Sequence, residues 1–347
     1  MNTERLQTLL SCFPHHRILV FGDFFLDQYL EIDPKLNEVS IETGKIAYQI
    51  VGKRLQPGAA GTVCNNLTAL GIGGITALSV IGDDGEGYEL RKALAARRVA
   101  GGQMIVSPQR FTPTYTKPMV QLPDREEELE RQDIKNRRPL PEAVETELLQ
   151  RLETMIAAAD AVIIADQVQE RNCGVVTDRA RARIAELAQE NPKILFFADS
   201  RERIGEFKNV YTKPNRSEAT RSVQQYYPGE IPTYLAVSCA QTLRQRTGKS
   251  VFLTLDQEGI CPVTEHETPI IPCPPVTGLI DIVGAGDSVT AGIVSSLASG
   301  ACEAEAAIIG NLVASITIRQ LGTTGAATPQ QVLEAWNANE ALYREIA

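Results

Sequence analysis

The chain is organised around the octapeptide Asp281-Ile282-Val283-Gly284-Ala285-Gly286-Asp287-Ser288. Apolar residues recur after it at helical spacing, so the octapeptide predicts a tight loop that opens a helix. Gly284 and Gly286 lack the Cβ atoms that would keep a phosphate from the backbone, and the free N–H groups of a helix's first turn attract anions. We therefore expect a phosphate-binding cradle at residues 284–286.

Asp287 is an unusual residue in an anion-binding site, because its carboxylate repels the phosphate beside it. It fits if the carboxylate takes a proton from an attacking hydroxyl while the neighbouring amides stabilise the transferring phosphoryl group. We expect the helix terminus to keep Asp287 ionised. An ordinary turn in which Asp287 only caps a helix is the alternative, and these residues alone leave it open.

The octapeptide resembles the D-T-x-G-A-G-D signature of the ribokinase, or PfkB, family of carbohydrate kinases, with Ile282 where threonine is usual. The resemblance implies that Asp287 is the catalytic base and that the amides of Gly284, Ala285 and Gly286 form an anion hole. It covers essentially the whole chain. It implies ATP-dependent transfer of the γ-phosphoryl group to a hydroxyl of a sugar or sugar phosphate.

The composition is that of a globular protein, with 43% apolar and 22% charged residues among 347. The net charge of -9 and the lack of a Lys/Arg block disfavour a nucleic-acid partner. No apolar run is long enough to cross a bilayer, so we expect a cytoplasmic protein without a membrane partner. Seven scattered cysteines without C-x-x-C spacing predict neither a disulfide framework nor a zinc site.

Buried strands and helices alternate along the chain. The apolar run from Arg17 to Phe21 is typical of a strand buried on both faces, and strand-like and helix-like segments alternate from 75 to 198. This rhythm predicts an α/β fold with a mostly parallel sheet. By resemblance we expect one domain over 1–347, a ribokinase-like three-layer α/β/α sandwich.

A small one-faced β-sheet is predicted by alternating apolar and polar residues outside this rhythm. It corresponds to the β lid of the family, formed here by about 28–56 and 112–134. In the family this lid closes over the sugar and often pairs with a second subunit. The resemblance therefore implies a homodimer through the lid.

Several residues are expected near the acceptor. Asp23 and Asp27 follow a buried strand, where ligands commonly bind, although alone they also fit a turn cap. The resemblance implies that Asp27, and with less support Asp23, binds sugar hydroxyls. The other expected acceptor residues are Gly58, Thr62, Asn66, Lys117, Arg131, Asp166 and Arg201. Lys117 and Arg131 also fit a solvated strand edge, and Arg201 also fits a structural ion pair.

The segment that includes Thr62 departs from the family pattern. Pro57 to Asn66 opens a helix with small residues and aligns with the family's G-G-A-A-N, but Ala59 replaces the second glycine and Thr62 the asparagine. A hydroxyl offers different hydrogen bonds from an amide. The identity of the acceptor therefore does not transfer from the family.

The nucleotide side is better preserved. Lys213 to Glu218 matches the family's P-N-x-x-E, which holds Mg²⁺ through water beside ATP, and Thr254 to Gly259 resembles its T-x-G-x-x-G with Asp256 at the middle glycine. The resemblance implies nucleotide contacts by Lys213, Asn215, Thr254, Gly259, Asn311 and Gly322, and Mg²⁺ at Asn215 and Glu218. It also allows K⁺ beside Asp281. Alone, the 215–218 tetrapeptide is a helix start, and Asn311 equally fits a buried amide satisfied by backbone.

Among the branches of the family, the heptose-phosphate kinases are the most similar. The residues that carry this similarity are F-G-D-F-F-L-D, A-D-S-R, K-P-N-R-S-E and L-G-T-T. Two alternatives stay open: a nucleoside kinase of the same fold, and a sugar or nucleotide sensor without catalytic activity. The presence of Asp287 favours an enzyme, because a sensor could lose it freely.

Overall fold

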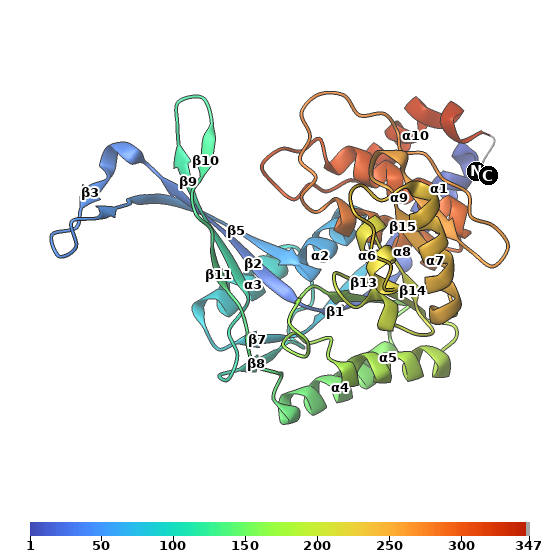
Figure 1. Ribbon diagram of the computed structural model, residues 1–347, viewed down its shortest axis with the longest axis horizontal. Coiled ribbons are helices and arrows are strands. Elements are labelled where there is room, and N and C mark those ends of the chain that lie inside the picture. Colours follow the sequence, from blue (N-terminus) through green and yellow to red (C-terminus); the bar gives the residue numbers. More distant parts are fainter. Residues whose placement is uncertain (345–347) are drawn as a thin grey trace.

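A seven-stranded sheet forms the centre of the computed structural model, which describes residues 1–344 (Figure 1). Every neighbouring pair is parallel except the last pair at one edge, so the prediction of a mostly parallel sheet is confirmed. In order across the sheet the strands are β16 (Ile260–Val263), β15 (Val251–Thr254), β14 (Tyr211–Thr212), β13 (Leu195–Ser200), β12 (Ala161–Asp166), β1 (Arg17–Gly22) and β6 (Gly74–Leu78).

Helices cover both faces of this sheet. Ile18 and Val20 of β1 belong to one apolar cluster, while Leu19 and Phe21 belong to a second, because successive side chains of a strand point to opposite faces. The helices of the first cluster are α1 (Thr3–Cys12), α2 (Ala60–Ala69), α3 (Gly85–Ala96), α8 (Ala285–Ala298), α9 (Glu303–Thr317) and α10 (Pro329–Tyr343). The helices of the second are α4 (Glu142–Ile156), α5 (Asp178–Glu190), α6 (Arg216–Ser222) and α7 (Thr233–Thr247). The expected three-layer α/β/α sandwich is confirmed.

A second sheet projects from the body and is called the lid below (Figure 1). Its strands, in order, are β10 (Glu126–Glu128), β9 (Thr114–Gln121), β2 (Phe24–Ile32) and β5 (Ile50–Ala59), with β11 (Gln132–Ile134) also paired with β9. At its far end β3 (Glu38–Val39) and β4 (Ile46–Ala47) form a small hairpin.

The lid strands lie within 24–59 and 114–134, against the predicted 28–56 and 112–134. β2 starts early because the chain runs from β1 through Asp23 directly into the lid. The short parallel pair β7 (Val80–Gly82) and β8 (Ile105–Ser107) lies beside this junction.

The two predicted glycine-rich helix starts are both present, and they lie against each other. Gly284 precedes α8 with φ +80°, and a Cβ on it would lie 3.2 Å from Thr62 Cγ2 and 3.3 Å from Thr324 Cγ2. Ala59 precedes α2 with φ +52° and ψ -120°, a conformation that favours glycine. The backbone here therefore keeps the form typical of glycine although alanine occupies the position.

Within residues 1–344, no helix combines the length and hydropathy that crossing a bilayer would require. In the same range all seven cysteines are unpaired. Cys64, Cys173, Cys239 and Cys261 are buried, whereas Cys302 is exposed.

Candidate active site

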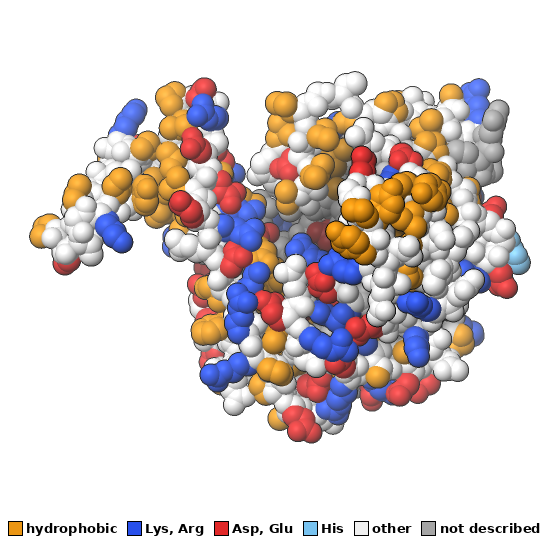
Figure 2. Space-filling view, viewed as in Figure 1, with side chains coloured by type: hydrophobic (Ala, Val, Ile, Leu, Met, Phe, Trp, Pro, Cys, Tyr) orange, Lys and Arg blue, Asp and Glu red, His pale blue; other side chains and the backbone are white. Residues whose placement is uncertain are grey.

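The predicted functional residues converge on one edge of the main sheet. β1, β12, β13 and β14 all end there, and the first turn of α8 and the base of the lid lie beside them. Figure 2 shows a hollow between the lid and the body, with basic side chains on both of its sides. This edge, the α8 terminus and the lid together form the candidate site.

Asp287 lies in a group of charged side chains at the start of α8. Lys213, which follows β14 and is buried, forms an ion pair of 3.0 Å between its Nζ and Asp199 Oδ2. The same Nζ would lie 3.5 Å from a Cβ on Gly286, so this cation sits against the glycine-rich turn. Thr290, one turn further along α8, donates to Asp199 Oδ2 at 3.3 Å. Asp199 and Lys213 are thereby docked onto the helix that carries Asp287.

Burial, reinforced by the charge of Asp199, raises the pKa of Asp287 to about 7 from its ordinary 3.8. Lys213 and Arg201 oppose this rise, and Asp27 adds to it. The pKa therefore moves in the direction opposite to the one that the helix terminus favours, and the carboxyl is only partly ionised at neutral pH. A helix terminus contributes about 0.3–1 kcal/mol, whereas burial can move a pKa by several units. A pKa near 7 suits a group that must accept a proton at neutral pH.

Asn215 and Glu218 form a capping box at the start of α6. The Asn215 side chain accepts from the Glu218 N–H at 2.9 Å, and Glu218 Oε2 accepts from the Asn215 N–H at 2.8 Å. Burial, with Asp199 nearby, raises the pKa of Glu218 to about 7. The helix-start interpretation of this tetrapeptide is thus confirmed, and the capping box leaves the second carboxylate oxygen of Glu218 without a hydrogen bond from residues 1–344.

Asp27 is positioned on the lid strand β2 by a glycine in the neighbouring strand. A Cβ on Gly58 would lie 2.4 Å from Asp27 Oδ2, so only glycine leaves room for this carboxylate. Burial raises the pKa of Asp27, and Lys117 and Arg131 oppose the rise. Lys117 Nζ donates to the Tyr29 hydroxyl at 3.2 Å. Asp27 and these cations therefore belong to one electrostatic neighbourhood, which Asp287 shares.

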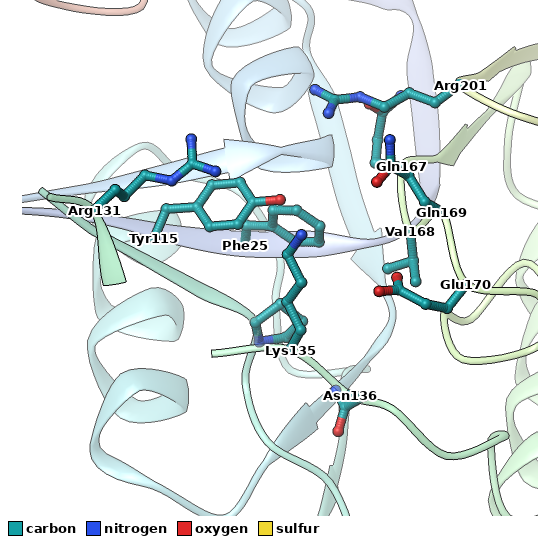
Figure 3. A pocket seen from close by; sticks show the side chains of 11 residues that line it. Phe25, Tyr115, Arg131, Lys135, Asn136, Gln167, Val168, Gln169, Glu170 and Arg201 are labelled. Atoms are coloured by element: carbon teal, nitrogen blue, oxygen red, sulfur yellow. The ribbon is translucent and has the colours of Figure 1, made fainter. Parts of the chain in front are cut away.

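A cavity of about 200 Å³ lies between the lid and the loop after β12. Figure 3 shows Arg131, Tyr115 and Lys135 on its lid side, and Gln167, Gln169, Glu170 and Arg201 on the opposite side. Arg131 stacks on the Tyr115 ring at 4.4 Å and pairs with Asp133 through two hydrogen bonds of 2.7 and 2.9 Å. Phe25, Pro113, Asn136 and Val168 complete the lining.

Arg201 differs from the other cations of this cavity. It is exposed, and its Nε donates to the neutral Gln167 Oε1 at 2.9 Å. Lys135 Nζ, in contrast, lies 3.7 Å from Asp133 Oδ2. Among residues 1–344, Arg201 makes no ion pair, so its guanidinium is left to attract an anion from solution.

Four residues expected at the ligands point to protein groups instead. The Asp23 carboxylate accepts three backbone N–H groups of the loop after β12, and Asp166 pairs with Arg203 at 2.9 Å. Asn66 is fully buried in α2, where it donates to the Thr62 carbonyl at 3.0 Å. Asn311 donates to the Ile271 carbonyl at 2.8 Å, as the alternative of backbone satisfaction predicted. Each side chain is occupied by a partner distant in sequence or by its own helix.

Thr62 also has an internal partner. Its hydroxyl donates to the Pro57 carbonyl at 3.4 Å, and its methyl group faces Gly284. The residue that replaces the family's asparagine therefore packs at the seam between α2 and α8. Its position beside the glycine-rich turn supports a steric role there.

The nucleotide-side loops adopt the expected backbone forms. Asp256, which replaces a glycine of the family pattern, has φ +52°. Gly259 has φ +103°, and a Cβ atom on it would lie 2.0 Å from the Ile271 carbonyl oxygen. Thr254 ends β15 beside Asn215. Asp281 Oδ1 accepts from the Val283 N–H at 3.0 Å and Oδ2 from the Gly322 N–H at 3.2 Å. Asp281 thus joins the glycine-rich turn to the 321–325 loop.

Sequence reasoning missed two contributors to this site, Lys135 and Gln167. Asp199 was found by the signal that also selected Asp166, since both residues follow a buried strand at the ligand edge. Lys135 lies just beyond the predicted lid range, and Gln167 is an uncharged residue in an irregular loop. Neither carries a local pattern that marks it as functional.

The chain is similar in sequence to carbohydrate kinases. The sequence profile described as pfkB family carbohydrate kinase matches residues 25–331. The Bifunctional protein HldE of Trichlorobacter lovleyi is 28% identical over 341 residues, and that of Pelobacter propionicus is 27% identical over 342. Each alignment covers 96% of this chain and 66% of the relative, so the chain spans about two thirds of their length.

Solved structures share the fold at lower sequence identity. Phosphofructokinase-2 from Escherichia coli in complex with potassium has a TM-score of 0.69 and 18% identity, covering 95% of this chain and 100% of that one. Ribokinase from Arabidopsis thaliana, complexed with ribose and ATP, has a TM-score of 0.66 and 14% identity, covering 92% and 98%. These likenesses establish a ribokinase-like fold.

Proposed function

The chain belongs to the pfkB family of carbohydrate kinases, and we propose that it transfers the γ-phosphoryl group of ATP to a hydroxyl of a sugar phosphate. The observation that carries this proposal is the meeting of two features at one sheet edge. Asp287 lies in the first turn of α8, which the glycine-rich turn opens, and Arg201, which lines the basic cavity, is near enough to act electrostatically on Asp287. One feature suits phosphoryl transfer, and the other suits an anionic acceptor.

In the proposed reaction Asp287 acts as the general base. A pKa near 7 lets it accept the proton of the attacking hydroxyl at neutral pH. The N–H groups of Gly284 and Gly286 lie at the start of α8 and would stabilise charge on the transferring phosphoryl group. The Ala285 N–H, which was expected to join them, donates instead to the Ile282 carbonyl at 3.1 Å. Asp27 would hold and orient the sugar hydroxyls from the lid side. Orientation of this kind contributes strongly to the rate because it replaces a bimolecular encounter.

The acceptor is proposed to carry a phosphate that binds in the basic cavity. Arg201 has no acidic partner among residues 1–344, and Arg131 and Lys135 face it across the cavity. A guanidinium can bind two phosphate oxygens at once. A neutral sugar would leave Arg201 without an anionic partner, and Arg131 and Lys135 with only the Asp133 carboxylate between them. The similarity to HldE proteins supports the heptose-phosphate branch, and the exact sugar stays open.

Mg²⁺ fits the residues at the start of α6. Three carboxylates, those of Asp199, Glu218 and Asp287, lie around the buried Lys213, and burial, with the charge of Asp199 second, raises the pKa of Glu218 and of Asp287. Oxygen donors with several waters are what Mg²⁺ prefers. Glu218 and Asn215 would hold it through water, and Mg²⁺ would neutralise charge on the ATP phosphates. In residues 1–344 no cluster of three or more His, Cys, Asp or Glu forms a metal site by itself.

The nucleotide is proposed to lie along Thr254, Gly259 and Gly322, with Lys213 near its phosphates. The turn at Asp281 and Gly322 is also the proposed place for K⁺. There the two loops are tied together by the Asp281 carboxylate, whose second oxygen is 3.2 Å from the Gly322 nitrogen. The homologous fold has been solved with potassium in phosphofructokinase-2 of Escherichia coli.

The lid is proposed to pair with the lid of a second copy. The outer part of the lid, from residue 36 to 51, exposes a group of large apolar side chains, which Figure 2 shows on its projecting arm. They are Leu36, Val39, Ile41, Ile46, Tyr48, Ile50 and Val51, each at least 41% exposed. Contiguous apolar surface of this kind marks an interaction site.

The test of the proposed function is ADP release with Mg-ATP against hexoses, pentoses, hexose phosphates, heptose phosphates and nucleosides. We expect turnover with one of the sugar phosphates and little with the matching unphosphorylated sugar. A nucleoside as the preferred acceptor would support the nucleoside kinase instead. ATP-induced thermal stabilisation without ADP release from any acceptor would support the sensor, because binding alone stabilises the folded state.

A further inference from the structure

We infer that Asp23 is a positioning residue, which shapes the acceptor cavity from behind without contacting the acceptor. This inference rests on the proposed function, because it concerns the same cavity. Asp23 directly follows β1, and its side chain turns away from the lid into the loop of residues 167–175 that connects β12 to α5. That loop supplies the cavity wall opposite the lid (Figure 3).

The Asp23 carboxylate fixes both ends of this loop. Its Oδ2 accepts from the N–H groups of Gln167 at 2.9 Å and Val168 at 3.0 Å, and its Oδ1 accepts from that of Val175 at 2.8 Å. Asp23 is 4% exposed, so these bonds are shielded from water. Gly174 allows the approach, since a Cβ there would lie 2.6 Å from Asp23 Oδ1. Both carboxylate oxygens are therefore used by the protein itself.

Two arginines hold the carbonyl groups of the same loop. Arg203 donates to the Gln169 carbonyl at 2.8 Å and also to that of Val168, and it pairs with Asp166 at 2.9 Å. Arg110 donates to the Cys173 carbonyl. The loop is thus an irregular segment whose backbone groups are bound by buried charges from several elements, as buried loop backbone requires.

This loop also positions Arg201 through two hydrogen bonds. Gln167 Oε1 accepts from Arg201 Nε at 2.9 Å, and the Arg201 N–H donates to the Asp166 carbonyl at 3.2 Å. Fixing Gln167 therefore fixes the direction of the one cavity cation that lacks an acidic partner in the described chain. Asp23 therefore contributes to acceptor affinity indirectly: it holds Gln167, Gln167 holds Arg201, and Arg201 binds the acceptor.

The test compares Asp23→Asn with Asp27→Asn by amide hydrogen exchange and by kinetics. An asparagine at 23 turns an N–H₂ group toward backbone donors, so we expect the amides of Gln167, Val168 and Val175 to exchange about 10–100-fold faster. Asp27→Asn should leave these amides unchanged, although it weakens acceptor binding. Exchange in Asp23→Asn equal to that of the parent would overturn the inference.

Kinetics supply the readout on the site. For Asp23→Asn we expect KM for the phosphorylated acceptor to rise about tenfold or more, with kcat, KM for ATP and KM for the unphosphorylated sugar within about threefold. An equal rise in KM for both acceptors, with unchanged exchange, would make Asp23 a direct ligand and overturn the inference. If the parent phosphorylates no sugar phosphate, the proposed function fails, and the exchange experiment still decides the role of Asp23.

Gln167→Met covers the case in which Asp23→Asn does not fold. Methionine keeps the length of the side chain and removes the acceptor of the Arg201 hydrogen bond, while the backbone bonds to Asp23 remain. We expect a rise of about tenfold in KM for the phosphorylated acceptor, and unchanged exchange at Val168 and Val175. An unchanged KM would refute the step from the loop to Arg201.

Discussion

Replacing Asp287 with asparagine should stabilise the protein at alkaline pH while it removes the proposed base. Burial and Asp199 raise the pKa of this carboxyl to about 7, so the folded chain binds its proton more tightly than the unfolded chain does. The stability that this proton contributes is fully present below the ordinary pKa of 3.8 and is lost as the pH rises through about 7. Asparagine is neutral throughout and escapes this loss.

The expected size follows from the two pKa values. The difference between 3.8 and about 7 corresponds to about 4 kcal/mol at about 1.36 kcal/mol per pKa unit, which is the upper limit. Asp287 keeps partial contact with solvent, and screening lowers the figure to roughly 1–3 kcal/mol. We therefore expect Asp287→Asn to exceed the parent in free energy of unfolding by a gap that widens between pH 5 and pH 7 and reaches this amount at pH 8.

Urea unfolding at pH 5, 6, 7 and 8, without nucleotide and with a chelator, measures this difference. The single tryptophan, Trp336, is fully buried against Tyr343 and reports unfolding by fluorescence. Asp124→Asn, in an exposed turn of the lid, makes the same change in net charge and should show no pH-dependent gain. A gap between Asp287→Asn and parent that is constant with pH, or negative at pH 8, would refute the reasoning.

Three further predictions concern the acceptor side and the lid. Gly58→Ala should displace the Asp27 carboxylate, 2.4 Å from the new Cβ, and reduce kcat/KM for the acceptor by about 10–100-fold; an unchanged value would contradict this placement. Arg201→Ala should raise KM for a phosphorylated acceptor by about 10–100-fold and leave KM for ATP unchanged, and equal losses for both substrates would argue against a phosphate contact. Ile46→Asp should weaken dimerisation at least roughly tenfold in sedimentation, whereas Val106→Asp, outside the lid, should not; a dimer that survives Ile46→Asp would exclude this surface.

Local patterns predicted the features that depend on neighbours in sequence. The apolar run at 17–21 became the buried strand β1, and the glycine-rich octapeptide opens α8 where expected. The Asn215 to Glu218 spacing produced its capping box, which is a four-residue pattern by definition. In each case the deciding interactions lie within about one helical turn or one strand.

Long-range partners explain what the sequence could not predict. Asp23 was expected to face the sugar, yet its three hydrogen-bond donors lie 144, 145 and 152 residues away in the chain. The pKa of Asp287 is raised, which is opposite to the effect of the helix dipole. Burial and the Asp199 carboxylate cause the rise, and Asp199 lies on β13, far from Asp287 in sequence. Patterns along one segment carry no information about such neighbours.

The phosphoryl-transfer rate of Asp287→Asn tests the central claim most directly. With saturating Mg-ATP and the acceptor found for the parent, we predict that kcat falls by roughly 10²–10⁴-fold, the usual span for loss of a general base. The dissociation constant for ATP should stay the same, because the glycine-rich turn and Lys213 are intact. A kcat equal to that of the parent would contradict the assignment of Asp287 as the base.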